Sequence, residues 1–144
     1  MCIKKIKGFV KWFKERYKIR YWNLAFIYAL FIILLSSMPI PPSPEHLVGL
    51  SFSNTFKHIV LYMGFGLCLG IAFRHSPNKN FSRNSYLWAI VFGILFAVFD
   101  EYYQGFHSRT TDGLDMIADS FGVAIAQAFR WFLKMEEKWL HKIF

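Results

Sequence analysis

The chain has few cysteines and little charge, and each shortage excludes a class of protein. Its 144 residues include two cysteines, Cys2 in a basic N-terminal stretch and Cys68 in the middle of an apolar run. A bridge between them is implausible, and Cys68 is interpreted as a small apolar core residue, so redox chemistry finds no support. Only 18% of the residues are charged, whereas soluble domains carry about 25%. The length leaves room for a single domain.

The residues that replace charge are hydrophobic and aromatic, at 55% and 20% of the chain. This composition is typical of a protein that faces lipid tails and has aromatic side chains at the membrane interfaces. The net charge of +8 does not indicate nucleic-acid binding, because the basic residues gather near the two ends of the chain instead of covering one face of a soluble fold. Membrane lipids are therefore the expected partner, and nucleic acid is not.

Four apolar segments are each close to the ~20 residues that cross a hydrocarbon core. They run approximately from Trp22 to Met38, Thr55 to Phe73, Ser85 to Tyr103 and Asp112 to Leu133. Backbone groups in lipid must be hydrogen-bonded within their own segment, so each is predicted to be a helix. The predicted fold class is all-α: a polytopic membrane protein with a bundle of four transmembrane helices over residues 22–144.

Residues 1–21 form a separate segment, basic and amphipathic. Apolar residues recur there at three- and four-residue steps, and lysines occupy the other positions. This pattern predicts a helix that lies in the plane of the lipid headgroups.

The distribution of Lys and Arg predicts the orientation. Residues 1–21, 74–83 and 130 onward hold fifteen of the seventeen Lys and Arg, and only Lys57 and Arg109 fall on the other side. By the positive-inside rule, both termini are cytoplasmic. The predicted localisation is therefore the cytoplasmic membrane, multi-pass, with most of the acidic residues at the outer face.

Three of the predicted spans each carry polar residues on one narrow face, at ~100° per residue. They are His58 with Tyr62, Asp100 with Gln104 and neighbouring Glu101, and Asp112 with Asp115 and Asp119. Small residues, Gly93, Ala97, Gly122 and Ala126, continue these faces, which predicts close packing of the three helices. An aspartate within a membrane should face the bundle and find a partner. Arg109 is the best candidate partner, because its planar fork can hold carboxylates.

The stretch from Asp100 to Arg109 (DEYYQGFHSR), followed by Asp115, Asp119 and Gly122, resembles the signature of the VanZ-like membrane family. His58 and Tyr62 resemble the family's second-helix element, a His followed four residues later by an aromatic residue. The resemblance covers about the last two thirds of the chain. This chain has Tyr103 where many relatives have His, and Thr55 where many have a basic residue.

The resemblance implies a bacterial cell-envelope protein, and founding relatives are linked to resistance against the glycopeptide teicoplanin. It implies no reaction, so enzymatic activity stays open. The preferred hypothesis is an outward-facing pocket between the second, third and fourth spans that binds, modifies or shields an envelope component. Such a component is a lipid-linked cell-wall precursor, a phospholipid headgroup or a glycopeptide antibiotic.

In this hypothesis the site residues fall into two groups. The candidate catalytic residues, suited to acid–base work, are His58, Asp100, Glu101, Asp115 and Asp119. The candidate ligand-binding residues are Lys57, Tyr62, Gln104, Phe106 and Arg109, of which Arg109 and Lys57 would engage an anionic group.

Two other classes of function stay open. The polar residues could be a structural network in a membrane scaffold or interaction protein. A small transporter with a proton relay is the third class, but it needs ionisable groups across the whole bilayer, and the cytoplasmic halves of the predicted spans lack them. No cofactor and no metal are predicted, since no dense ligand spacing accompanies His58.

Overall fold

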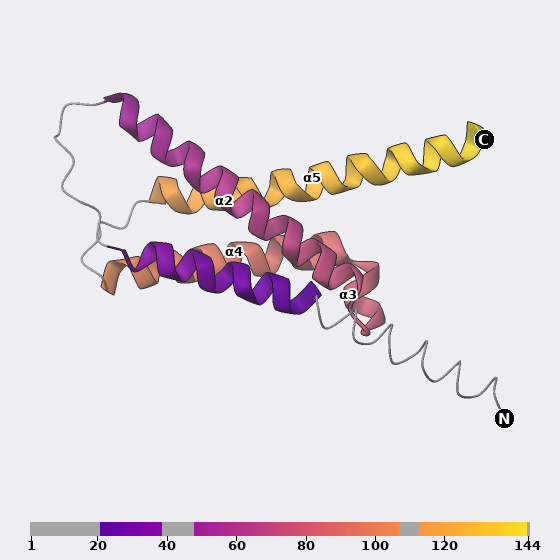
Figure 1. Cartoon of the computed structure of the whole chain (residues 1–144), viewed down its shortest axis with the longest axis horizontal. Helices are drawn as coiled ribbons and strands as arrows, with labels where there is room; N and C mark the ends of the chain where they lie inside the picture. Colours follow the sequence, from indigo (N-terminus) through magenta and orange to yellow (C-terminus); the bar gives the residue numbers. More distant parts are fainter. Residues whose placement is uncertain (1–20, 39–47, 107–112, 144) are drawn as a thin grey trace.

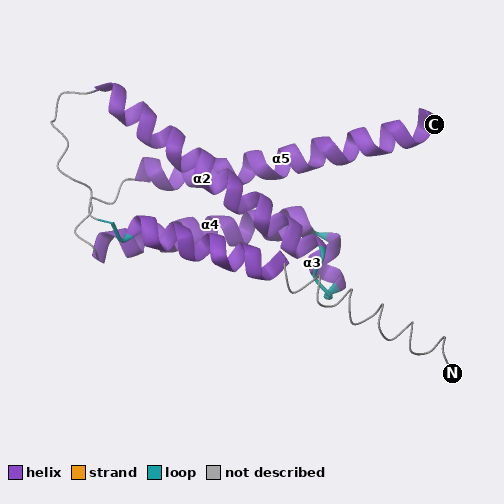
Figure 2. Cartoon of the chain, in the orientation of Figure 1, coloured by secondary structure: helices purple, strands orange, loops and turns teal. Residues whose placement is uncertain are grey.

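The structure is a computed structural model that describes residues 21–38, 48–106 and 113–143. Within these ranges all regular secondary structure is helical (Figure 2), which confirms the all-α class. The amphipathic helix predicted for the N-terminal segment lies outside the described residues, except for Tyr21.

The described helices follow the predicted apolar segments closely. They are Tyr21–Ser36, followed by α2 (Val48–Arg74), α3 (Lys79–Arg83), α4 (Ser85–Phe106) and α5 (Gly113–Ile143). α2 begins before the predicted Thr55, and α5 continues beyond the predicted Leu133. Hydropathy marks the part of a helix that suits lipid, whereas backbone hydrogen bonding can continue past it into the interface.

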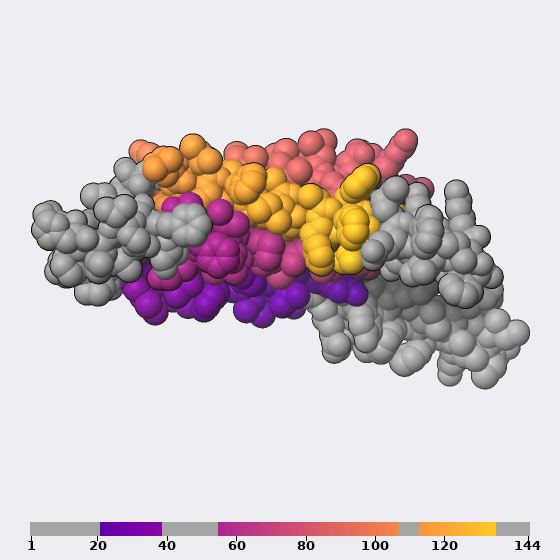
Figure 3. Space-filling model, turned by 90° about the horizontal axis from the view of Figure 1, so that it is seen from above, coloured from indigo at the N-terminus to yellow at the C-terminus, as the bar shows by residue number. Residues whose placement is uncertain are grey.

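α2 is the central helix of the bundle. It packs against both α4 and α5, and in Figure 1 it crosses α5 diagonally while the Tyr21–Ser36 helix lies beside α4. Viewed from above, α5 lies between α4 and α2 on the visible face, with the Tyr21–Ser36 helix along the edge next to α2 (Figure 3). Aromatic pairs attach the Tyr21–Ser36 helix to α2: ring centroids are 5.0 Å apart for Trp22 and Phe73 and 6.2 Å apart for Tyr28 and Phe65.

Small residues set the close contact between α2 and α5. A Cβ atom built on Gly122 would collide with the carbonyl oxygen of Ile59 in α2. On the other side, a Cβ on Gly66 would come within 3.0 Å of the Val123 Cα in α5. The two backbones therefore nearly touch, as the predicted small-residue faces require.

Two of the described helices are long and apolar enough to cross a membrane. They are Thr55–Arg74 within α2 and Ser85–Phe106, which is α4, and Tyr21–Ser36 is apolar but shorter. Many large apolar side chains point outward, including Phe26 at 69% exposed and Leu95 at 60% exposed. These surfaces fit a lipid environment better than water. α3 joins α2 to α4 at one end of the bundle. The polar residues predicted to form the site lie at the other end.

Candidate functional site

The polar residues converge at the end of the bundle that is far from α3. The four long helices alternate in direction along the chain, so the ends of Tyr21–Ser36 and α4 meet the first halves of α2 and α5 (Figure 1). Ser36 ends the first described helix, and Asp115 lies in the first turn of α5. A carboxylate is favoured there by the partial positive charge of the helix N-terminus.

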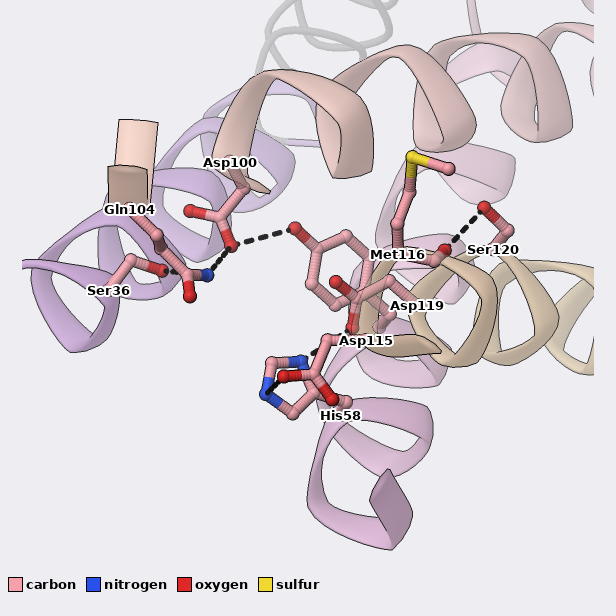
Figure 4. A network of polar contacts seen from close by, with 9 residues as sticks. Ser36, His58, Asp100, Gln104, Asp115, Met116, Asp119 and Ser120 are labelled. Carbon is pink, nitrogen blue, oxygen red and sulfur yellow. Dashed lines mark hydrogen bonds and ion pairs between the residues drawn. The ribbon is translucent and has the colours of Figure 1, made fainter. Parts of the chain in front are cut away.

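His58 of α2 lies between two aspartates of α5 (Figure 4). Its Nδ1 is 2.9 Å from an oxygen of Asp119, and its Nε2 is 3.7 Å from an oxygen of Asp115. The Asp119 side chain is 1% exposed and that of His58 is 12% exposed, so this contact is shielded from solvent. When Asp119 is ionised it can only accept, so the Nδ1 atom of His58 carries the hydrogen of this bond.

Asp100 of α4 is the centre of a second set of contacts. The Tyr62 hydroxyl and the Gln104 side-chain amide both donate to the same Asp100 oxygen, each at 3.1 Å. The Gln104 amide also donates to the Ser36 hydroxyl at 3.3 Å, which connects the Tyr21–Ser36 helix to the network. Asp100 is 1% exposed. Side chains from three helices are therefore joined in one network around a buried carboxylate.

Each of these two buried aspartates keeps one oxygen without a hydrogen-bond partner among the described residues, namely Oδ1 of Asp100 and Oδ2 of Asp119. A buried carboxylate oxygen without a partner is costly, so it requires a specific reason. Arg109, the partner predicted from the sequence, lies outside the described residues. These two oxygens can accept a hydrogen bond from a donor, contact a cation or take up a proton.

A cavity of about 160 Å³ opens onto this network. Its polar lining comes from the side chains of Ser36, Lys57, His58, Tyr62, Asp100 and Gln104. Lys57 is exposed and adds a positive charge to the lining, whereas the Asp100 carboxylate only accepts hydrogen bonds and the other polar side chains can both donate and accept. The cavity can therefore hold a group that carries both a donor and a negative charge.

The structure brings most of the predicted site residues to this cavity or its border. Glu101 is also buried, at 9% exposed. Phe106 is 77% exposed, and its ring packs on the neighbouring Tyr102 at a centroid distance of 5.6 Å, not in the cavity. Within the described residues, no group of three or more His, Cys, Asp or Glu is arranged to hold a metal ion.

Two serines of the Tyr21–Ser36 region were not predicted from the sequence. Ser36 receives the Gln104 hydrogen bond, and the Ser37 hydroxyl lies 3.0 Å from the Tyr103 hydroxyl of α4. The only signal was the pair of hydroxyl residues at the end of an otherwise apolar segment. Tyr103 thus makes a polar contact with the end of the first apolar segment.

The sequence groups Arg130 with the basic residues of the C-terminal part of the chain, and the structure packs its side chain against neighbouring helices. Arg130 is half-buried in α5, its Nη1 donates to the Gln127 side chain at 2.5 Å, and its Cζ lies 4.8 Å from the centre of the Tyr86 ring. Gln127 in turn donates to the Gly66 carbonyl of α2 at 2.7 Å. An ionisable side chain therefore also lies in the half of the bundle near α3, whereas the predicted cytoplasmic halves of the spans were expected to lack ionisable groups.

Comparison with known proteins gives one match. The VanZ/LLP1 family, represented by a sequence model, matches residues 7–134, which include every residue of the cavity. No curated protein and no solved structure matches the chain.

Proposed function

The chain belongs to the VanZ/LLP1 family of membrane proteins, and from this premise we propose that it acts at the outer face of the bacterial cytoplasmic membrane. There its polar cavity binds an envelope component, and the binding alters tolerance to glycopeptides such as teicoplanin. The candidate components are a lipid-linked cell-wall precursor, a phospholipid headgroup and the antibiotic itself.

The proposed topology has four membrane crossings with both termini in the cytoplasm. The basic residues support it, because all but Lys57 and Arg109 lie in the N-terminal segment, the α3 region and the C-terminal part of the chain. In this orientation the cavity opens at the outer leaflet, where envelope lipids and glycopeptides are found.

The observation that carries the proposal is the pair of buried aspartates with unsatisfied oxygens. Asp100 and Asp119 are each 1% exposed, and each has one oxygen without a hydrogen-bond partner among the described residues. A purely structural network would be expected to use both oxygens, since a half-satisfied network costs stability. Ionisable groups held in this way within a membrane protein favour function over architecture.

The residues have distinct roles in the proposal. Lys57 and Arg109 attract an anionic group, and Asp100 accepts a hydrogen bond from the bound molecule. His58 lies against Asp119, at 2.9 Å, and near Asp115, at 3.7 Å. It can take up or release a proton there, which is the chemistry required of an acid–base residue if the component is modified.

A matched pair of Tyr→Phe variants tests the proposal. Tyr62→Phe removes the hydroxyl that donates to Asp100, whereas Tyr102→Phe removes a hydroxyl from a side chain that is 72% exposed. We expect Tyr62→Phe and Asp100→Asn to abolish the effect on teicoplanin susceptibility at normal membrane abundance, and Tyr102→Phe to preserve it. Full tolerance in Asp100→Asn cells would refute the proposal. Parallel loss of abundance and tolerance would favour the structural alternative.

A second measurement separates binding from modification. The lipids and cell-wall precursors of cells with and without the protein are compared by mass spectrometry. A new or depleted species that reverts in the Asp100→Asn strain indicates a reaction. An unchanged profile beside altered tolerance indicates that the protein binds or shields its ligand without changing it.

A further inference from the structure

An apolar groove of about 480 Å³ lies next to the polar cavity. The same elements line both, namely the Tyr21–Ser36 helix, α2 and α4. Its lining includes Ala29, Phe65, Leu69, Leu95, Phe96 and Phe99. The groove is apolar throughout and open along one side, so a hydrocarbon chain suits it and a polar group does not.

Tyr62 forms the boundary between the groove and the cavity. Its hydroxyl donates to Asp100 in the cavity, while its ring centroid is 6.1 Å from that of Phe65 and 6.3 Å from that of Phe96. Along α4, Phe96 of the groove lies one helical turn from Asp100 of the cavity. One amphiphilic molecule can therefore place its polar part in the cavity and its apolar part in the groove.

The cavity also defines the chemistry of the polar part. The Asp100 Oδ1 atom is buried and has no partner within the described part of the chain, so it calls for an N–H or O–H donor. Lys57 is exposed, lines the same cavity and attracts an anion. A phosphate with a neighbouring amine or hydroxyl satisfies both groups.

We propose that the cavity and the groove together bind one membrane lipid, with its phosphate and adjacent donor at Lys57 and Asp100 and one hydrocarbon chain along Phe65, Phe96 and Phe99. This deepens the proposed function and rests on it for the outward orientation of the cavity.

From Ser36 to Trp22 the helix is ~20 Å long, which exceeds the ~15 Å thickness of one leaflet's hydrocarbon. A chain of ordinary membrane length therefore fits. Two sources share this chemistry, a phospholipid with a free amine and a polyprenyl-diphosphate-linked sugar.

Photo-crosslinking of the full chain in lipid nanodiscs tests the proposal. Phosphatidylethanolamine with a diazirine in the middle of one acyl chain is one probe, and polyprenyl-diphosphate N-acetylglucosamine with a diazirine in its chain is the other. We expect at least one of them to label peptides that contain residues 25–29, 65–69 and 92–99, in preference to exposed positions on α5. The probe that labels identifies the source. Even labelling over all lipid-facing surfaces would overturn the proposal.

Matched tryptophan variants locate the binding. Ala29→Trp fills the groove, and Leu95→Trp narrows it at a position that is 60% exposed and so does not disturb the packed interior. Ala124→Trp is the control, because Ala124 is exposed on α5 outside the groove. We expect the first two to reduce groove labelling about tenfold, which corresponds to the loss of a few buried methylene groups. Unchanged labelling in both would rule out the groove.

A methylated headgroup tests the donor. Phosphatidylcholine carrying the same diazirine has no N–H. If the amine lipid is the ligand, phosphatidylcholine should label the groove about tenfold less than phosphatidylethanolamine does. Asp100→Asn should reduce this difference in labelling between the two lipids. Equal labelling by the amine and methylated lipids, with no labelling by the sugar-linked probe, would overturn the headgroup assignment.

Groove labelling combined with full teicoplanin tolerance in Asp100→Asn cells would refute the proposed function alone. Lost tolerance with an unlabelled groove would refute the lipid proposal alone.

Discussion

Among single residues, His58 has the most demanding environment, because one imidazole faces two carboxylates. Its Nδ1 is within hydrogen-bond distance of Asp119, whereas its Nε2 is 3.7 Å from Asp115. Asp115 and Asp119 are one turn apart on α5, so their charges repel when both are ionised. A histidine between them relieves this repulsion, and it does so most when it carries a proton.

Removal of His58 should therefore destabilise the protein through Asp119. We expect His58→Ala to lower the free energy of unfolding by about 1–3 kcal/mol, because it leaves the buried Asp119 carboxylate without its donor. In an Asp119→Asn background, the loss of His58 should lower the free energy of unfolding by a smaller amount. The double variant should therefore lose less stability than the sum of the losses in the two single variants. Thermal unfolding of the purified protein in detergent measures all three.

The control for this cycle is His75→Ala. His75 is exposed, its Nδ1 contacts a carbonyl of its own helix, and its ring stacks on that of Tyr21 at a centroid distance of 4.3 Å. Its removal should therefore cost about 0.5–1 kcal/mol, less than the removal of His58. If His75→Ala were as costly as His58→Ala, or if the two site substitutions were simply additive, the contact with Asp119 would not contribute as the geometry indicates.

At the scale of helices, the site depends on the close approach of α5 to α2. His58 can reach Asp119 only if the two helices pack without intervening side chains. Gly122 lies one turn beyond Asp119 and faces the backbone of α2 at Ile59. The glycine therefore sets the spacing that the polar contact needs.

Alanine substitutions at two glycines of α5 should have opposite effects. Gly122→Ala forces the helices apart, and we expect a loss of about 1–3 kcal/mol from overpacking. At Gly113 an added Cβ meets no atom of the described residues within 4 Å, so Gly113→Ala should be neutral or stabilise by up to about 1 kcal/mol through reduced backbone entropy. Thermal unfolding in detergent measures both. A Gly122→Ala protein as stable as the parent would show that α5 does not depend on this contact.

Much of this packing could be predicted from the sequence, because helical periodicity decides which residues share a face. The polar pair Asp100 and Gln104 and the small residues Gly93 and Gly122 are all buried, as expected. The environment of Arg130 could not be predicted. Its burial depends on the space above Gly70, where an added Cβ would collide with the guanidinium, and on the Tyr86 ring of another helix. A hydropathy pattern records that Arg130 is charged but not where its long side chain reaches.

The network around Asp100 was only partly predictable for the same reason. Tyr62 and Asp100 were assigned to faces that should meet, and the structure joins them at 3.1 Å. Ser36 belongs to a helix that carries no charge in its apolar run, and the pair of serines at its end does not identify α4 as the partner. Contacts between helices that are distant in the sequence require the three-dimensional arrangement.

At the scale of the whole molecule, the two ends of the described bundle differ in charge. The end near α3 carries Arg74, Lys79 and Arg83. The opposite end carries Asp100, Glu101 and the aspartates of α5. Basic residues near the ends of membrane spans are retained in the cytoplasm. The charge difference therefore favours one orientation of α2 and α4, with the polar cavity outside.

Cysteine labelling on the two sides of α4 tests this orientation. Phe106→Cys places a thiol at the polar end of α4, and Lys79→Cys places one in α3, both at exposed positions, in a background with Cys2→Ser and Cys68→Ala. A membrane-impermeant maleimide should label Phe106→Cys in intact protoplasts and Lys79→Cys only after permeabilisation, because a helix of this length and apolarity separates the two sites across the bilayer. The reverse pattern would place the cavity in the cytoplasm and refute an outward-facing site. Labelling of both thiols in intact protoplasts would mean that α4 does not cross the membrane.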